Sequence, residues 1–119
     1  MTASQEQVEE LKHCFAGVQV GSEVDVPYYL IPAIALPPHC SPRIVDGLLC
    51  PLERDGYPSR LYYSHRVERP PRADPNKRLN WTGEVRILER NWHCLSWKIP
   101  GGTVLRLAQM VLTHLEAFS

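Results

Sequence analysis

The chain has 119 residues, of which 44% are hydrophobic and 22% are charged, and its formal net charge is zero. This length suits one domain spanning residues 1–119, with a core large enough to fold without disulfide bonds. The composition excludes an intrinsically disordered chain, and no apolar run approaches the roughly 20 residues of a membrane-spanning helix. Residues 1–10 are polar and acidic, unlike a signal peptide, so we expect a cytoplasmic protein with no membrane partner.

Charge is distributed unevenly along the chain. Residues 1–59 carry a balance of −5, residues 60–90 a balance of +4, and residues 91–119 a balance of +1. This polarity is typical of a protein that meets a protein partner in a fixed orientation, and equally of a solvated basic loop.

The first predicted element is a helix near the start of the chain. Ser4 followed by Gln7 is a capping-box pattern, in which the serine oxygen accepts from a free amide of the first turn. Val8, Leu11 and Phe15 then recur at helical spacing on one face. Gly17 is a suitable end for this helix.

Strand periodicity replaces helical periodicity between residues 18 and 63. β-forming residues fill positions 28–36, interrupted by Pro32, and a second apolar run covers residues 44–52. Turn residues at 37–42 and 53–56 separate these runs from a third strand at 61–63. Such short connections predict an antiparallel meander of three or four strands.

A long loop and a helix complete the expected fold. Residues 66–80 are basic and proline-rich, which predicts a surface loop, and residues 85–87 within the ambiguous stretch 81–97 alternate like a strand. Residues 100–102 break the chain, and Thr103 is placed to cap a final helix. The apolar stripe of that helix comprises Val104, Leu107, Ala108, Val111, Leu115 and Phe118. The predicted class is therefore α+β.

Several short motifs occur in an order that resembles a known family. Gly56-Tyr57-Pro58 leads into a strand at 61–65, residues 29–38 combine apolar residues with prolines, and Trp92 and Ser96 precede an Ile-Pro-Gly triplet at 99–101. Together they resemble the prokaryotic ubiquitin-conjugating-enzyme-like (UBC-like) proteins of family E. The resemblance covers roughly residues 28–118 and rests on the order of several weak motifs.

This resemblance implies a compact UBC-like fold and a place in a bacterial pathway that conjugates a ubiquitin-like protein. The implied partners are the ubiquitin-like protein and a ubiquitin-activating-like enzyme. The chain would act either as a thioester carrier or as a catalytically silent docking partner. The first helix of the family is basic, whereas Glu6, Glu9 and Glu10 make this one acidic.

Cys94 is the candidate nucleophile that the resemblance implies. It follows the Tyr-Pro turn and the long loop, and His93 beside it could lower its pKa or relay a proton. His65, at the end of the third strand, is a further acid/base candidate. Asn76, in Asp74-Pro75-Asn76, lies 18 positions before Cys94, about twice the family's separation, so a plain turn is the alternative there. Residues 92–95 also fit a buried strand.

The remaining cysteines are assigned other places. His39-Cys40 is expected to be exposed on a loop, whereas Cys14 and Cys50 are expected to pack in the core. No Cys-x-x-Cys spacing occurs, so we expect no metal and no cofactor, although a zinc site from Cys40, Cys50, His39 and His65 is conceivable.

An alternative function from another class is nucleic-acid binding. The stretch from Arg60 to Arg90 is basic and interleaved with Tyr62, Tyr63 and Trp81, which could follow phosphates and stack on bases. The neutral total charge and the absence of a recognised motif argue against nucleic acid as a partner.

Overall fold

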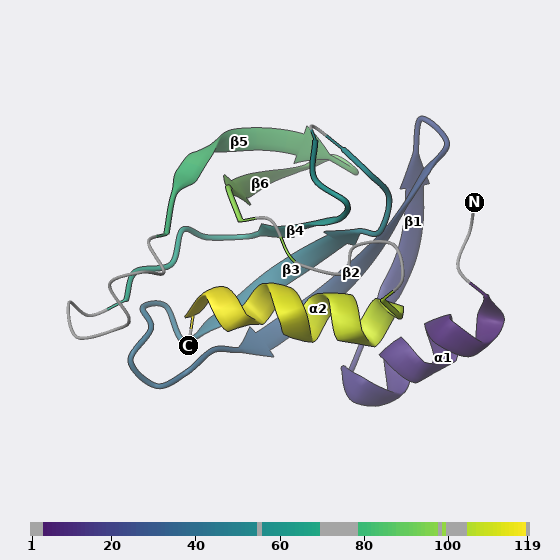
Figure 1. Ribbon diagram of the computed structural model, residues 1–119, viewed down its shortest axis with the longest axis horizontal. Coiled ribbons are helices and arrows are strands. Elements are labelled where there is room, and N and C mark those ends of the chain that lie inside the picture. Colours follow the sequence, from purple (N-terminus) through teal and green to yellow (C-terminus); the bar gives the residue numbers. More distant parts are fainter. Residues whose placement is uncertain (1–3, 55, 70–78, 98, 100–104, 119) are drawn as a thin grey trace.

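The computed structural model describes residues 4–54, 56–69, 79–97, 99 and 105–118. Within these residues the fold is α+β: an N-terminal helix, an antiparallel sheet and a C-terminal helix (Figure 1). The elements are α1 (Gln5–Cys14), β1 (Gln19–Glu23), β2 (Val26–Ala35), β3 (Ile44–Cys50), β4 (Arg60–Tyr63), β5 (Trp81–Ile87), β6 (Arg90–Leu95), α2 (Leu107–Leu115) and a short 3-10 turn, η2 (Glu116–Phe118).

Among the described residues the sheet has six strands where three or four were expected, in the order β1-β2-β3-β4-β6-β5. The first four strands form the expected antiparallel meander. The additional strands come from residues 81–97, whose hairpin pairs Ile87 with Arg90 and adds β6 to β4 through Tyr63 and His93. The predicted number of strands was too small because, within this stretch, only residues 85–87 alternate like a strand in the sequence.

Pro32 does not break β2 as its position in the sequence indicated. The strand continues past it, and the pairing with β3 shifts between Ile31 and Ile34. Ala33 takes a positive φ of 52° at this bulge, and its N–H donates to Asp46 Oδ1 at 2.8 Å. The side chain of Asp46 thus replaces a ladder partner that the irregular strand cannot offer.

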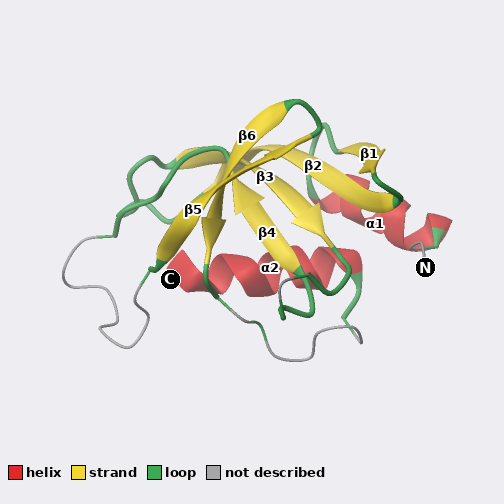
Figure 2. Ribbon diagram, turned by 90° about the horizontal axis from the view of Figure 1, so that it is seen from above, coloured by secondary structure: helices red, strands yellow, loops and turns green. Residues whose placement is uncertain are grey.

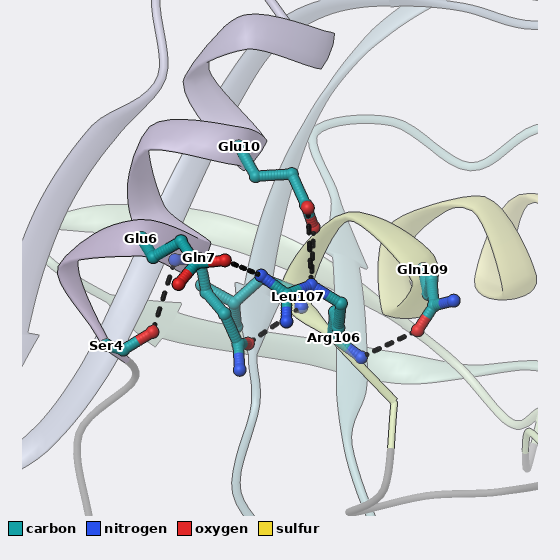
Figure 3. Close-up of polar contacts among 7 residues, drawn as sticks. All are labelled: Ser4, Glu6, Gln7, Glu10, Arg106, Leu107 and Gln109. Carbon is teal, nitrogen blue, oxygen red and sulfur yellow. Dashed lines mark hydrogen bonds and ion pairs between the residues drawn. The ribbon is translucent and has the colours of Figure 1, made fainter.

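The ends of the two helices differ in how well they were predicted. Ser4 Oγ accepts from the Gln7 N–H at 3.2 Å, which confirms the expected N-cap of α1. The N-cap of α2 is Arg106, so the proposed cap at Thr103 is wrong, because the helix begins three residues later. Gln109 Oε1 accepts from the Arg106 N–H there, as Figure 3 shows.

α1 and α2 are joined by polar contacts across about 100 positions of sequence. Arg106 Nε donates to Glu10 Oε1 at 3.0 Å, and its Nη2 lies 3.3 Å from Glu6 Oε1. Gln7 Oε1 accepts from the Leu107 N–H at 3.2 Å (Figure 3). Two of the acidic residues of α1, Glu6 and Glu10, therefore hold this helix against the start of α2.

The sheet separates two apolar clusters. The helix-side core lies between the sheet and the helices and includes Leu11, Leu49, Tyr63, Leu107 and Phe118. The hairpin-side core lies on the opposite face and consists of Tyr28, Leu48, Cys50, Tyr62, Ile87 and Trp92, with Cys94 packed against it. Figures 1 and 2 show α2 across one side of the sheet while β5 and β6 arch away from it. The tip of this hairpin reaches β1, where Glu23 Oε2 accepts from the Leu88 N–H.

The first residues of the basic segment after β4 pack against the rest of the fold. Val67 is buried, Glu68 forms a bridge with Ser41, and the Val67 carbonyl accepts from Trp81 Nε1 at 3.1 Å. Arg66 and Glu68 are exposed in a loop as expected, the burial of Val67 departs from that prediction, and positions 70–78 lie outside the described residues. None of the helices in the described part of the chain has the length and apolar character needed to cross a membrane.

Candidate functional site

His93 and Cys94 are neighbours on β6, and a strand sends neighbouring side chains to opposite faces. Cys94 packs half-buried against the hairpin-side core. His93 lies in register with Tyr63 and with Glu84, and its Nδ1 is 3.6 Å from Glu84 Oε1. The structure therefore points the imidazole away from the thiol that it was expected to activate.

His65 belongs to a different polar cluster, formed with Ser64, Asp46 and Arg90. Its Nδ1 lies 2.9 Å from Ser64 Oγ, and Arg90 Nη2 lies 2.6 Å from Asp46 Oδ2. The Ala33 N–H and Arg90 stabilise the ionised carboxylate and lower the pKa of Asp46, and His65 contributes in the same direction. His65 thus stands at the start of β6, away from the Cys94 end.

The immediate surroundings of Cys94 include a buried phenol that sequence reasoning missed. Tyr62 is 1% exposed, and its hydroxyl has no hydrogen-bond partner among the described residues. Burial raises the pKa of Tyr62 to about 12, against the opposing influence of Arg54 and Arg60. Cys50 and Cys94 also lie close enough to contribute to the raised pKa of Tyr62. Tyr62 is therefore a neutral donor at neutral pH, on the same face as the thiol.

The Tyr57-Pro58 turn closes over the end of β6. Tyr57 Oη lies 2.6 Å from Ser96 Oγ, and Arg60 Nη2 donates to the Leu95 carbonyl at 3.4 Å. The Arg60 guanidinium stands 4.4 Å from the centre of the Tyr57 ring and 5.4 Å from that of Tyr62. A cation and two aromatic rings thus hold the backbone directly after Cys94. In the sequence, the only indication of this arrangement is that residues 60 and 62 lie two positions apart, which puts both side chains on the same face of a strand.

Two of the remaining cysteines lie elsewhere than expected. Cys40 is 3% exposed, and its Sγ lies 3.7 Å from the Phe118 carbonyl, so its expected exposure is wrong. Burial raises the pKa of the Cys40 thiol. Cys14 is exposed as the last residue of α1, so its assignment to the core is also wrong, although it lies only three positions from the buried Leu11. Cys50 is buried as expected.

The conceivable zinc site is not assembled in the described part of the chain. Cys40 and His39 both approach the Phe118 carbonyl, whereas Cys50 lies in the hairpin-side core. Within those residues no group of three His, Cys, Asp or Glu side chains is placed to hold a metal ion. Asn76 lies outside the described residues.

The chemistry available at the Cys94 end of β6 is that of a thiol beside a neutral phenol donor and near a buried guanidinium. Such a setting can support thiol acyl transfer, which needs a thiolate, a hydrogen-bond donor and no cofactor. Comparison of the chain with known protein families, with curated proteins and with solved structures finds no match.

Proposed function

We propose that this chain is a UBC-like component of a bacterial pathway that conjugates a ubiquitin-like protein, working with a ubiquitin-activating-like enzyme. The observation that carries the proposal is the 2.6 Å contact between Tyr57 Oη and Ser96 Oγ. It joins two of the three segments on which the family resemblance rests, and Ser96 lies two residues from Cys94. The order of helix, antiparallel meander and final helix supports the same proposal.

Two roles in that pathway are compatible with the site. In the carrier role, the Cys94 thiolate attacks the carbonyl carbon of the thioester on the activating enzyme. A new sulfur–carbon bond forms, the old one breaks, and the activating enzyme's cysteine leaves as a thiolate. In the docking role, the chain brings the ubiquitin-like protein to its activating enzyme without accepting it. Because His93 and Cys94 point to opposite faces of the sheet, the histidine does not activate the thiol, and the docking role is supported as well as the carrier role.

The test mixes the purified chain with a ubiquitin-activating-like enzyme, a ubiquitin-like protein and ATP. A carrier forms an adduct that thiol treatment cleaves, and Cys94→Ala abolishes it. Cys94→Ser then forms an ester that resists thiol but yields to alkali. Cys14→Ala is the matched control, because Cys14 is an exposed thiol remote from the site.

A docking partner gives a different pattern from a carrier. No adduct forms on this chain, yet conjugation by the other proteins depends on its presence and survives Cys94→Ala. An outcome in which the chain neither forms an adduct nor binds either protein would refute the proposed function in both roles.

The described part of the Arg60–Arg90 stretch gives little support to nucleic-acid binding. Tyr62 and Tyr63 are each 1% exposed and Arg60 is 7% exposed, so none of the three is available to a base or phosphate. Tyr62 packs in the hairpin-side core and Tyr63 in the helix-side core.

A further inference from the structure

A cavity of about 370 Å³ opens on the hairpin side of the sheet. Its lining comes from the turn after β1, the first residues of β2, the segment after β3 and the end of β5. Val26, Leu52 and Ile87 supply apolar walls, and Tyr28 and Arg54 supply polar groups. A volume of this size is typical of small-molecule sites, and the lining combines apolar side chains with several charged ones.

Arg54 is the feature of this cavity that points to a ligand. Its side chain is half-buried, and its Nη1 donates to the Tyr28 hydroxyl. Within the described part of the chain, no carboxylate lies at ion-pair distance from it, whereas Arg90 and Arg106 both have acidic partners. A guanidinium has five N–H donors in a planar fork, and one neutral phenol leaves most of them unused.

The groups around Arg54 do not neutralise it. Burial raises the pKa values of Tyr28 and Tyr62, so both phenols stay neutral at neutral pH. The Tyr62 hydroxyl, close to Arg54, has no hydrogen-bond partner among the described residues. Arg54 therefore brings to the cavity a positive charge that the neighbouring phenols do not neutralise, which favours an anion.

The charges at the rim restrict the kind of anion. Glu23 and Glu53 both line the cavity, and repulsion from two carboxylates disfavours a multiply charged ligand such as phosphate. Glu23 is held by the Leu88 N–H, and Arg86 Nη1 donates to Asn91 Oδ1 at 3.3 Å. A single negative charge with an apolar body fits this distribution better than a bare anion.

We propose that this cavity binds an organic monocarboxylate, with its carboxylate on Arg54 and its short apolar body against Val26, Leu52 and Ile87. A planar guanidinium fork matches the two oxygens of a carboxylate. The site lies on the same sheet face as Cys94 but does not use that thiol, so the inference is independent of the conjugation pathway.

The experiment titrates hexanoate into the full chain and follows its ¹H–¹⁵N spectrum. We expect shifts centred on the amides of Tyr28, Cys50, Arg54 and Ile87, with a dissociation constant on the order of 1 mM for so small a probe. Hexanamide, which has the same body without the charge, and inorganic phosphate, which has charge without the body, should each bind at least about tenfold more weakly.

Two variants and one matched control decide the assignment. Arg54→Gln should weaken hexanoate binding about tenfold or more, whereas Arg43→Gln, which removes an exposed arginine, should leave it unchanged. Leu52→Trp fills the apolar part of the cavity and should also abolish binding, so the test stands even if Arg54→Gln does not fold. Equal affinity in Arg54→Gln and wild type, equal binding of hexanamide or phosphate, or no shifts at about 10 mM hexanoate would overturn the proposal.

Discussion

Acid should destabilise this protein through one buried histidine. His114 lies on α2 and is 4% exposed, with its Nε2 3.0 Å from the Oγ of Ser59, which is also buried. Burial lowers the pKa of His114 from 6.5 to about 4, and the nearby Arg60 guanidinium acts in the same direction. The unfolded chain therefore takes up a proton on His114 at a higher pH than the folded chain does.

The sign and size of the effect follow from this difference. The depressed pKa means that stability is complete above pH 6.5 and is lost as the pH falls toward 4, because protonation favours the unfolded chain. With 1.36 kcal/mol per pKa unit, the loss at pH 4.5 is about 2.5 kcal/mol. The lowered pKa of Asp46 acts only below its ordinary value of 3.8, outside this window.

Urea unfolding of wild type and His114→Gln at pH 7.5 and pH 4.5 measures the effect. The free energy of unfolding should fall between the two pH values by about 2 kcal/mol more in wild type than in the variant. His13→Gln, at an exposed position, is the matched control and should keep the full pH dependence of wild type. An equal fall in wild type and His114→Gln would refute the reasoning, because it would show that His114 titrates alike in the folded and unfolded states.

Three further predictions concern packing and thiol exposure. Leu107→Ala should lower the free energy of unfolding by about 2–5 kcal/mol in urea, since the side chain is 1% exposed. Leu112→Ala, at 55% exposure, should change it by less than about 0.5 kcal/mol, and a similar loss in both variants would contradict this packing. Gly47→Ala should cost about 1–3 kcal/mol in the same assay, because a Cβ there would stand 2.6 Å from Ile34 Cδ1; an unchanged midpoint would count against that crowding. Iodoacetamide followed by mass mapping should modify Cys14 first and Cys40 only on unfolding, and early modification of Cys40 would argue against its burial.

The helices were predictable because their signals are local. The Ser4 cap is a contact between residues three positions apart, and the apolar spacing from Leu107 to Val111 marks the buried face of α2 within a single turn. The order of the strands in the sheet was harder to predict from the sequence. Placing β6 between β4 and β5 depends on the pairing of Tyr63 with His93, a contact across 30 positions that no local period encodes.

The candidate site was predicted in part and for the same reason. Cys94 and the Tyr57-Pro58 turn were identified from their order in the chain, but the direction of each side chain depends on the register of β6. That register sends His93 to the other face and brings Tyr62 beside Cys94. The exposed Cys14 and the buried Cys40 were misassigned because neither helical phase nor loop composition shows which residues a distant segment covers.

The contacts between α1 and α2 also bear on the order of folding. A ten-residue helix is marginal by itself in water, and the side chains of Glu10 and Gln7 form hydrogen bonds with residues 106 and 107. Closing the long loop between Glu10 and Arg106 costs entropy before any contact is made. We therefore expect α1 to stay largely unformed in the folding transition state. Substitutions at Glu10 or Gln7 should then speed unfolding and leave the folding rate nearly unchanged, which places α1 among the last elements to dock.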